Sequence, residues 1–120
     1  VQTCALPISR ILFATREREL LDRVSLKVLI GEKLTVLDKS NITIECAATG
    51  APTPTLSWSK DNIKLENSQS SLLLLSNVEL KDAGRYTCTA ENFLGFVSYS
   101  TVLSVRGKGL FPDKQQLIDN

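Results

Sequence analysis

The sequence contains no histidine, so any candidate site lacks the residue that most often acts as a general base or binds a metal. It also lacks a Gly-rich phosphate loop, and its carboxylates are scattered rather than clustered as a metal site requires. No apolar run approaches the length needed to cross a bilayer. With 14 Lys and Arg against 13 Asp and Glu, the chain has no excess of positive charge for nucleic acid or anionic membranes. We therefore expect no enzyme activity, cofactor, metal, nucleic-acid partner or direct membrane insertion.

Cysteine is scarce as well, with three residues in 120. The first of them, Cys4, lies in residues 1–9 (VQTCALPIS), which resemble a common sequencing adapter translated in one frame. We interpret this segment as an artefact outside the evolved protein, comparable to a fusion scar. The alternative is a genuine loop that carries a free thiol. Without Cys4, the cysteines Cys46 and Cys88 remain as an even pair.

The length of 120 residues has room for one domain with flanking segments. Residues 10–23 mix charged and apolar side chains without a two-residue period, which favours a linker from a preceding domain over a short helix. Period-two alternation predicts a domain over residues 24–106, and the polar residues 107–120 predict a second linker. No signal peptide is visible, so we expect an internal fragment of a longer multidomain protein.

Within residues 24–106, apolar and polar residues alternate in short runs separated by turn residues, which is the pattern of an all-β sandwich. The expected strands cover residues 25–30, 34–36, 41–48, 56–58, 63–65, 72–75, 84–92 and 97–105. Alternation places Ile42, Ile44 and Cys46 on one face of their strand. It places Tyr86 and Cys88 on one face of another.

The most specific feature is a set of residues at fixed offsets: Cys46, Trp58 twelve residues later, and the run DAGRYTC from Asp82 to Cys88. Supporting motifs are Gly50-Ala51-Pro52-x-Pro54, Trp58-Ser59-Lys60-Asp61, Leu75-x-Asn77-Val78 and Ala90-x-Asn92 followed by Gly95. On these residues, the chain from Ser25 to Val105 resembles the immunoglobulin superfamily, and within it the intermediate (I-set) type. The resemblance implies an all-β fold, a two-sheet antiparallel immunoglobulin-like β-sandwich.

The resemblance also implies a core. Cys46 and Cys88 would join the two sheets through a disulfide, with Trp58 packed beside the sulfur atoms. The alternative is two buried free thiols, a state that related domains inside muscle cells keep. The residues of the core signature are Trp58, Leu75, Asp82, Gly84 and Tyr86.

The hydroxyl of Tyr86 is expected to form a hydrogen bond with the backbone near Asp82 and so to fix the turn that enters the strand of Tyr86. The side chain of Asp82 is expected to cap the same turn. Members of the family often pair this acid with an arginine on a neighbouring strand. Here Lys64 is the available substitute, with weaker geometry.

Four consecutive leucines at residues 72–75 are ambiguous by periodicity alone. The spacing from Val78 predicts that Leu73 and Leu75 face inward, which leaves Leu72 and Leu74 facing outward. Two exposed leucines on one sheet face are either covered by residues 11–21 or a neighbouring domain, or form a binding face. We favour the first of these two interpretations.

Two other features concern the surface. Asn41-Ile42-Thr43 is an N-glycosylation sequon, and Asn41 faces outward if Cys46 faces inward, although the tripeptide also occurs by chance.

Phe93, Leu94 and Phe96 flank the last hairpin tip, at an end of the sandwich where ligands or neighbouring domains dock. These three residues are the candidate interface.

The family binds proteins or connects other domains, so the expected partners are an unidentified protein and the adjacent domains of the same chain. Our first hypothesis is an extracellular module, secreted or on the cell surface, for recognition, adhesion or spacing in a matrix protein. The stretch Val28–Val36 is similar to matrix proteins of the papilin and ADAMTS-like kind. The alternatives are an intracellular muscle module of the titin or twitchin type with reduced cysteines, and an ectodomain module of a receptor kinase.

Overall fold

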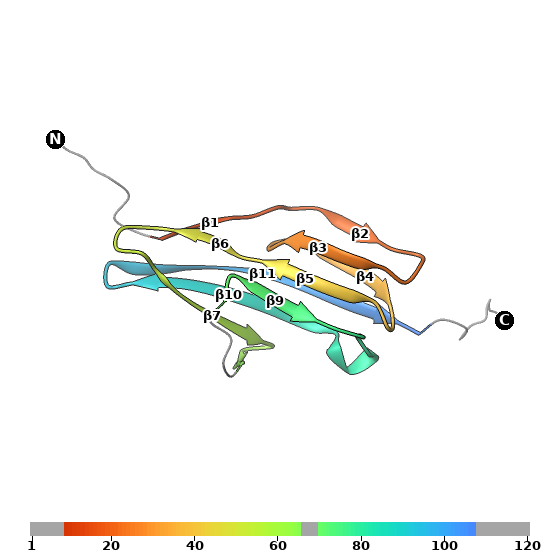
Figure 1. The fold of residues 1–120 in the computed structure, drawn as a ribbon. Helices are drawn as coiled ribbons and strands as arrows, with labels where there is room; N and C mark the ends of the chain where they lie inside the picture. The colour runs from red at the N-terminus through yellow and green to blue at the C-terminus, as the bar shows by residue number, and fades with distance from the viewer. Residues whose placement is uncertain (1–8, 66–69, 108–120) are drawn as a thin grey trace.

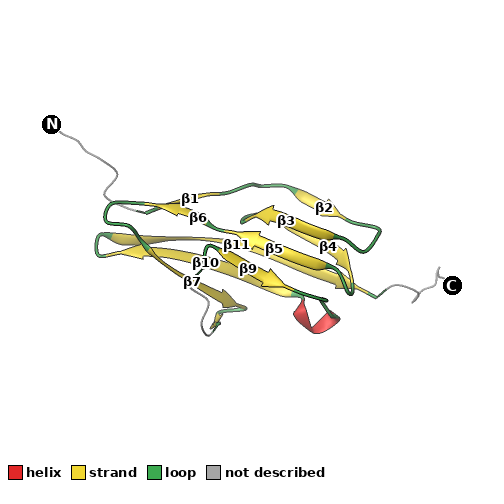
Figure 2. Ribbon diagram, viewed as in Figure 1, coloured by secondary structure: helices red, strands yellow, loops and turns green. Residues whose placement is uncertain are grey.

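A computed structural model describes residues 9–65 and 70–107, and these residues form two stacked layers of β-strands (Figure 1, Figure 2). The elements are β1 Arg10–Leu12, β2 Glu17–Glu19, β3 Ser25–Leu29, β4 Lys33–Leu37, β5 Asn41–Glu45, β6 Ala47–Thr49, β7 Thr55–Lys60, β8 Ile63–Lys64, β9 Leu72–Leu75, the 3-10 helix η1 Leu80–Asp82, β10 Gly84–Asn92 and β11 Gly95–Arg106. The predicted all-β sandwich is therefore confirmed. The predicted artefact at residues 1–9 and the predicted linker at 107–120 lie outside the described residues, apart from Ser9 and Gly107.

The larger sheet has the strand order β2-β4-β11-β10-β7-β8, and the smaller sheet has the order β3-β5-β9. Strand β6 follows β5 after Cys46 and pairs with β1. Successive side chains of a strand point to opposite faces, so an apolar residue at every second position builds one continuous core between the sheets. The fully buried apolar side chains include Ile30, Leu34, Val36, Ile42, Ile44, Trp58, Val78 and Leu103.

Three strand pairs are parallel, in contrast to the expected antiparallel arrangement: β4 with β11, β2 with β4, and β3 with β5. The chain reverses at Gly31, whose backbone φ of 112° is readily adopted by glycine alone. Strands β3 and β4 therefore run in opposite directions and enter different sheets, rather than forming one split strand. Because the chain reverses again at residues 38–40, β3 and β5 run in the same direction.

Residues 10–23, expected to be a linker, contribute two strands to the sandwich. Strand β1 pairs antiparallel with β6, and β2 pairs parallel with β4 (Figure 1). Ile11 is 7% exposed and belongs to the core. The period of two is not visible in the sequence because each strand has three residues and most of their side chains face solvent. The segment covers the outer edges of β4 and β6, which would otherwise present unpaired backbone groups.

A disulfide between Cys46 and Cys88 joins the two sheets, with a Cα–Cα distance of 6.4 Å. Trp58 lies opposite Cys88 in the register of β7 and β10 and is 1% exposed. Its indole nitrogen donates a hydrogen bond to the carbonyl oxygen of Ser70 at 2.8 Å, so the only polar atom of this ring is satisfied. The core that the resemblance implies is therefore present, with the cysteines oxidised.

Tyr86 fixes the turn that enters β10, as predicted. Its hydroxyl donates to the carbonyl oxygen of Asp82 at 2.5 Å, and the Asp82 carboxylate accepts the backbone N–H that precedes η1 at 2.8 Å. The expected pairing of Asp82 with Lys64 is not among the ion pairs of the described residues. Lys60 stands opposite Tyr86 in the strand register and donates to the backbone of η1 at 2.7 Å, whereas Lys64 lies farther out, on the edge strand β8.

Gly84 is required by a close approach at the start of β10. A Cβ atom at this position would lie 2.7 Å from Oδ2 of Asp61, with backbone φ at 157°. The other oxygen of the same carboxylate accepts the backbone N–H of Arg85 at 3.0 Å. The Gly at this place in the signature therefore leaves room for a carboxylate that orders the beginning of the strand.

We expect Tyr86→Phe to lower the free energy of unfolding by about 1 kcal/mol, because it removes one hydrogen bond from a buried hydroxyl and leaves the ring in place. Urea denaturation at neutral pH measures the change. Tyr99→Phe is the matched control, because no hydrogen bond of the Tyr99 hydroxyl is found within the described residues. Equal losses in the two variants would contradict the role assigned to the Tyr86 hydroxyl.

The same residue predicts a dependence of stability on alkaline pH. Burial raises the pKa of Tyr86 to about 12, and the charges of Asp82 and Asp61 add to the shift. The unfolded chain releases this proton at a pKa of about 10, so the stabilisation is complete below about pH 10 and is lost as the pH rises toward 12. Urea denaturation across this range should show the free energy of unfolding falling more steeply for the unmodified chain than for Tyr86→Phe. Parallel curves would assign the dependence to another group.

Candidate interaction surface

Within residues 9–65 and 70–107, no group of three His, Cys, Asp or Glu side chains could hold a metal ion. No helix in this part of the chain is both long and apolar enough to cross a membrane. A hollow of about 600 Å³ beside β1 has a mostly apolar lining, which includes the stacked rings of Phe13 and Tyr99, 4.3 Å apart between centroids.

The hairpin tip, defined as Phe93, Leu94 and Phe96, is the clearest apolar feature of the surface. The exposed fractions of the three residues are 83%, 47% and 67%. Asn92 orders the tip, because its carbonyl oxygen accepts the N–H of Leu94 at 2.9 Å and its amide donates to the carbonyl oxygen of Pro52 at 3.0 Å. The loop between β6 and β7 lies at the same end of the sandwich (Figure 1). The tip therefore presents apolar side chains on an ordered support.

The leucines of β9 follow the predicted alternation in part. Leu73 and Leu75 pack against the core, Leu74 is 67% exposed, and Leu72 is half-buried. Residues 10–19 pair with β6 and β4 and do not cover Leu74, so this part of the expectation is wrong. A neighbouring domain or a binding partner remains as the predicted cover for this side chain.

Asn41 is exposed at the start of β5, and its side chain bonds to two neighbouring segments. Its amide nitrogen donates to Oγ of Ser25 at 3.3 Å, and its carbonyl oxygen accepts the backbone N–H of Asn77 at 2.8 Å. The predicted outward direction is therefore found. Glycosylation of this nitrogen stays a prediction.

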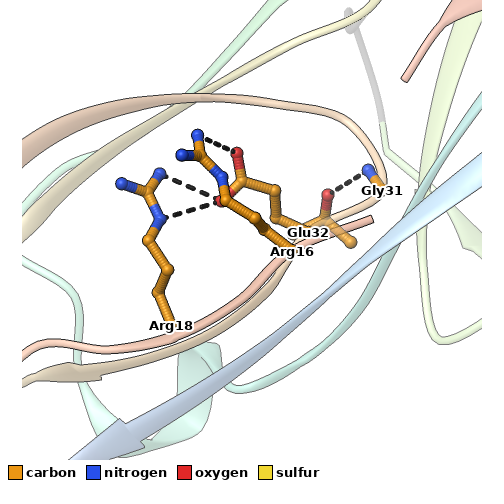
Figure 3. A network of polar contacts seen from close by, with 5 residues as sticks. Arg16, Arg18, Gly31 and Glu32 are labelled. Atoms are coloured by element: carbon orange, nitrogen blue, oxygen red, sulfur yellow. Dashed lines mark hydrogen bonds and ion pairs between the residues drawn. The ribbon is translucent and has the colours of Figure 1, made fainter. Parts of the chain in front are cut away.

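A buried ion cluster at Glu32 has no counterpart among the sequence predictions. The Glu32 side chain is fully buried in the turn between β3 and β4, and its carboxylate accepts hydrogen bonds from Arg16 at 3.2 Å and Arg18 at 2.9 Å (Figure 3). Both arginines come from residues 10–23. The sequence offers two separate signals, the Arg-x-Arg pattern at residues 16–18 and the Gly-Glu pair at residues 31–32, but neither specifies which acid the arginines meet. The cluster fastens β2 to the edge of the larger sheet.

Comparison with known proteins adds three findings. The immunoglobulin domain family model matches residues 28–92 of the chain, a range that contains Cys46, Trp58, Tyr86 and Cys88. The peroxidasin homolog of Mus musculus is 37% identical over 82 residues, which cover 63% of this chain and 6% of that protein. The neural cell adhesion molecule L1-like protein of Mus musculus is 33% identical over 88 residues, which cover 68% of this chain and 7% of that protein. The chain therefore spans less than a tenth of each of these relatives.

Among solved structures, a chimeric titin Z1Z2 functionalized with an exogenous peptide from decorin superimposes with a TM-score of 0.64. The superposition covers 88% of this chain and 100% of that one, at 23% sequence identity. At this identity the likeness establishes the fold and nothing further.

We expect Arg18→Ala to lower the free energy of unfolding by about 2 kcal/mol or more, because it leaves the buried carboxylate of Glu32 with one partner. Arg23→Ala is the matched control: its bond to Asp38 at 3.1 Å is solvent-exposed, and such pairs contribute about 1 kcal/mol or less. Urea denaturation compares the two variants. Adding Glu32→Gln to Arg18→Ala should recover part of the loss, since a neutral side chain costs less to bury. Equal effects of the two arginine substitutions would contradict the cluster's contribution.

Proposed function

The chain belongs to the immunoglobulin domain family, and on this premise we propose that it is a non-catalytic extracellular module of a longer protein. Its role in this proposal is protein recognition or adhesion, or the spacing of other domains in a matrix protein. The composition supports a non-catalytic role, because the sequence has no histidine and no phosphate-binding loop.

The disulfide between Cys46 and Cys88 is the observation that carries the extracellular location. Disulfides form and persist in oxidising compartments and are rare in the cytosol, where thiols are kept reduced. The similarity to a protein named as a neural cell adhesion molecule supports the same location. An intracellular muscle-type module would keep the two cysteines reduced.

The hairpin tip is the proposed contact with a protein partner or a neighbouring domain. Its three apolar side chains lie at one end of the sandwich, and Asn92 holds the supporting turn. An ordered apolar group of this kind loses little conformational freedom when it is covered by a partner.

The test is the intact mass of the 120-residue chain secreted from animal cells, measured with and without glycosidase and thiol alkylation. We use Cys4→Ser so that alkylation reports on Cys46 and Cys88 alone. The proposal expects a glycan that disappears in Thr43→Ala, which removes the sequon, and no alkylated cysteine. Two alkylated cysteines and no glycan would remove both supports and favour the intracellular muscle-type module.

A further inference from the structure

The N-terminal strap, which we define as residues 10–20, lies along one side of the sandwich (Figure 1). The immunoglobulin family model matches residues 28–92, so the strap lies outside the matched part of the chain. Ile11 is the one buried side chain of the strap. Backbone hydrogen bonds and ion pairs therefore hold the strap on the sandwich more than apolar packing does.

The strap binds to the edge strand β4 and the turn before it, and we call residues 30–35 the strap site. Three backbone hydrogen bonds of 2.8 to 3.0 Å join the two, and they link Ala14 with Ile30, Arg16 with Lys33, and Leu20 with Thr35. Gly31 leaves room for the strap, because a Cβ atom there would collide with the carbonyl oxygen of Ala14. The strap site is therefore shaped to take an extended backbone in one register.

The buried carboxylate of Glu32 makes the strap site selective. It accepts hydrogen bonds from Arg16 at 3.2 Å and Arg18 at 3.0 Å (Figure 3). A detached strap takes both partners away from this carboxylate, and a buried charge without a partner is strongly unfavourable. An open strap site therefore favours a strand with arginine at two alternate positions over other strands. Arg-x-Arg occurs once in the sequence, at residues 16–18, so a second copy of the chain carries a strand that fits.

A short reversal connects the strap to β3. On the far side of the reversal, Arg23 forms an ion pair with Asp38 at 3.1 Å. Between Leu20 and Arg23, the residues Leu21 and Asp22 are exposed, Leu21 by 76%. No hydrogen bond or ion pair of these two residues is found within residues 9–65 and 70–107. We call them the hinge, because the reversal can straighten there without breaking a bond.

We propose that two copies of this chain exchange their straps, so that the strap of each copy occupies the strap site of the other. The exchanged contacts are those already seen within one chain, and only the conformation of the hinge changes. The exchange therefore needs no further complementary surface. The Glu32 carboxylate favours the strap of a second copy over an unrelated strand as the replacement.

Closure within one chain competes with the exchange. A short linker holds its two ends at an effective concentration of about a millimolar. We therefore expect closed single chains at micromolar concentration and exchanged pairs at millimolar concentration. A hinge too short for the reversal removes this competition, so that a strap finds a strap site only on a second copy.

The test is disulfide trapping in the full 120-residue chain with Cys4→Ser, Glu17→Cys and Lys33→Cys. Glu17 and Lys33 are exposed and lie opposite each other in the register of β2 and β4. A closed strap links the two new cysteines within one chain, whereas an exchanged strap links two chains. Samples equilibrated at micromolar and at millimolar concentration are oxidised and separated by denaturing electrophoresis without reductant. The fraction of linked dimers should be at least about 10-fold higher in the millimolar sample.

Deletion of Leu21 and Asp22 should give linked dimers already at micromolar concentration. Adding Glu32→Gln to this deletion should weaken the dimers at least about 10-fold in sedimentation equilibrium, because the exchanged strap then meets no buried charge. Equal dimerisation with and without Glu32→Gln would contradict the selective role of this carboxylate.

The matched control keeps Glu17→Cys and replaces Lys33→Cys with Lys64→Cys, because Lys64 lies on β8, at the opposite edge of the larger sheet. The control should give no linked dimers at the same concentrations. Linked dimers as abundant as in the test variant overturn the proposal. So does their absence at millimolar concentration with the hinge intact, whether or not the deletion variant folds. The result is independent of the secretion experiment, because strap exchange requires neither a glycan nor an extracellular location.

Discussion

The link between Cys46 and Cys88 fixes the relation between the two sheets, and the rest of the molecule is arranged around it. The bond closes a loop of about 43 residues, which in the chain-entropy model stabilises the fold by about 4 kcal/mol. Trp58 occupies the neighbouring strand at the same level and fills the space beside the sulfur atoms. With one residue of β10 held in the core, the direction of every other side chain on that strand follows from the period of two.

The N-terminal segment depends on a different kind of interaction. Its strands β1 and β2 bury little apolar surface apart from Ile11, so hydrophobic packing alone holds them weakly. The buried carboxylate of Glu32 supplies what packing does not, because an unpaired charge in that position would be costly. The ion pairs of Arg16 and Arg18 with this carboxylate therefore hold the segment on the turn between β3 and β4. By pairing with β4, strand β2 of this segment covers an edge of the larger sheet. The ion pairs of the buried Glu32 therefore also help to keep this edge from pairing with another chain.

The sequence predicted those parts of the structure that depend on residues close together in the chain. Alternation predicted the strands that hold Trp58 and Tyr86, and the resemblance to the immunoglobulin superfamily predicted that these two residues and the cysteines face the core, where the structure places them. The strands of residues 10–19 could not be predicted, because three-residue edge strands leave no readable period. The partner of Glu32 could not either, because it depends on a chain reversal at Gly31 that brings distant residues together. The place of the hairpin tip between two strands could be predicted, whereas the hydrogen bond from Asn92 to Pro52 that supports it is a tertiary contact.

Strand β10 shows why the core of such a domain says little about its partner. The same period of two that buries Tyr86, Cys88 and Ala90 directs Arg85 and Glu91 to solvent. The inward residues must satisfy the packing of the sandwich, while the outward ones are constrained only by what meets the surface. A face that needed solubility alone would tolerate any mixture of charges. Arg85 and Glu91 occupy outward positions of this kind, and neither takes part in the packing that buries Tyr86, Cys88 and Ala90.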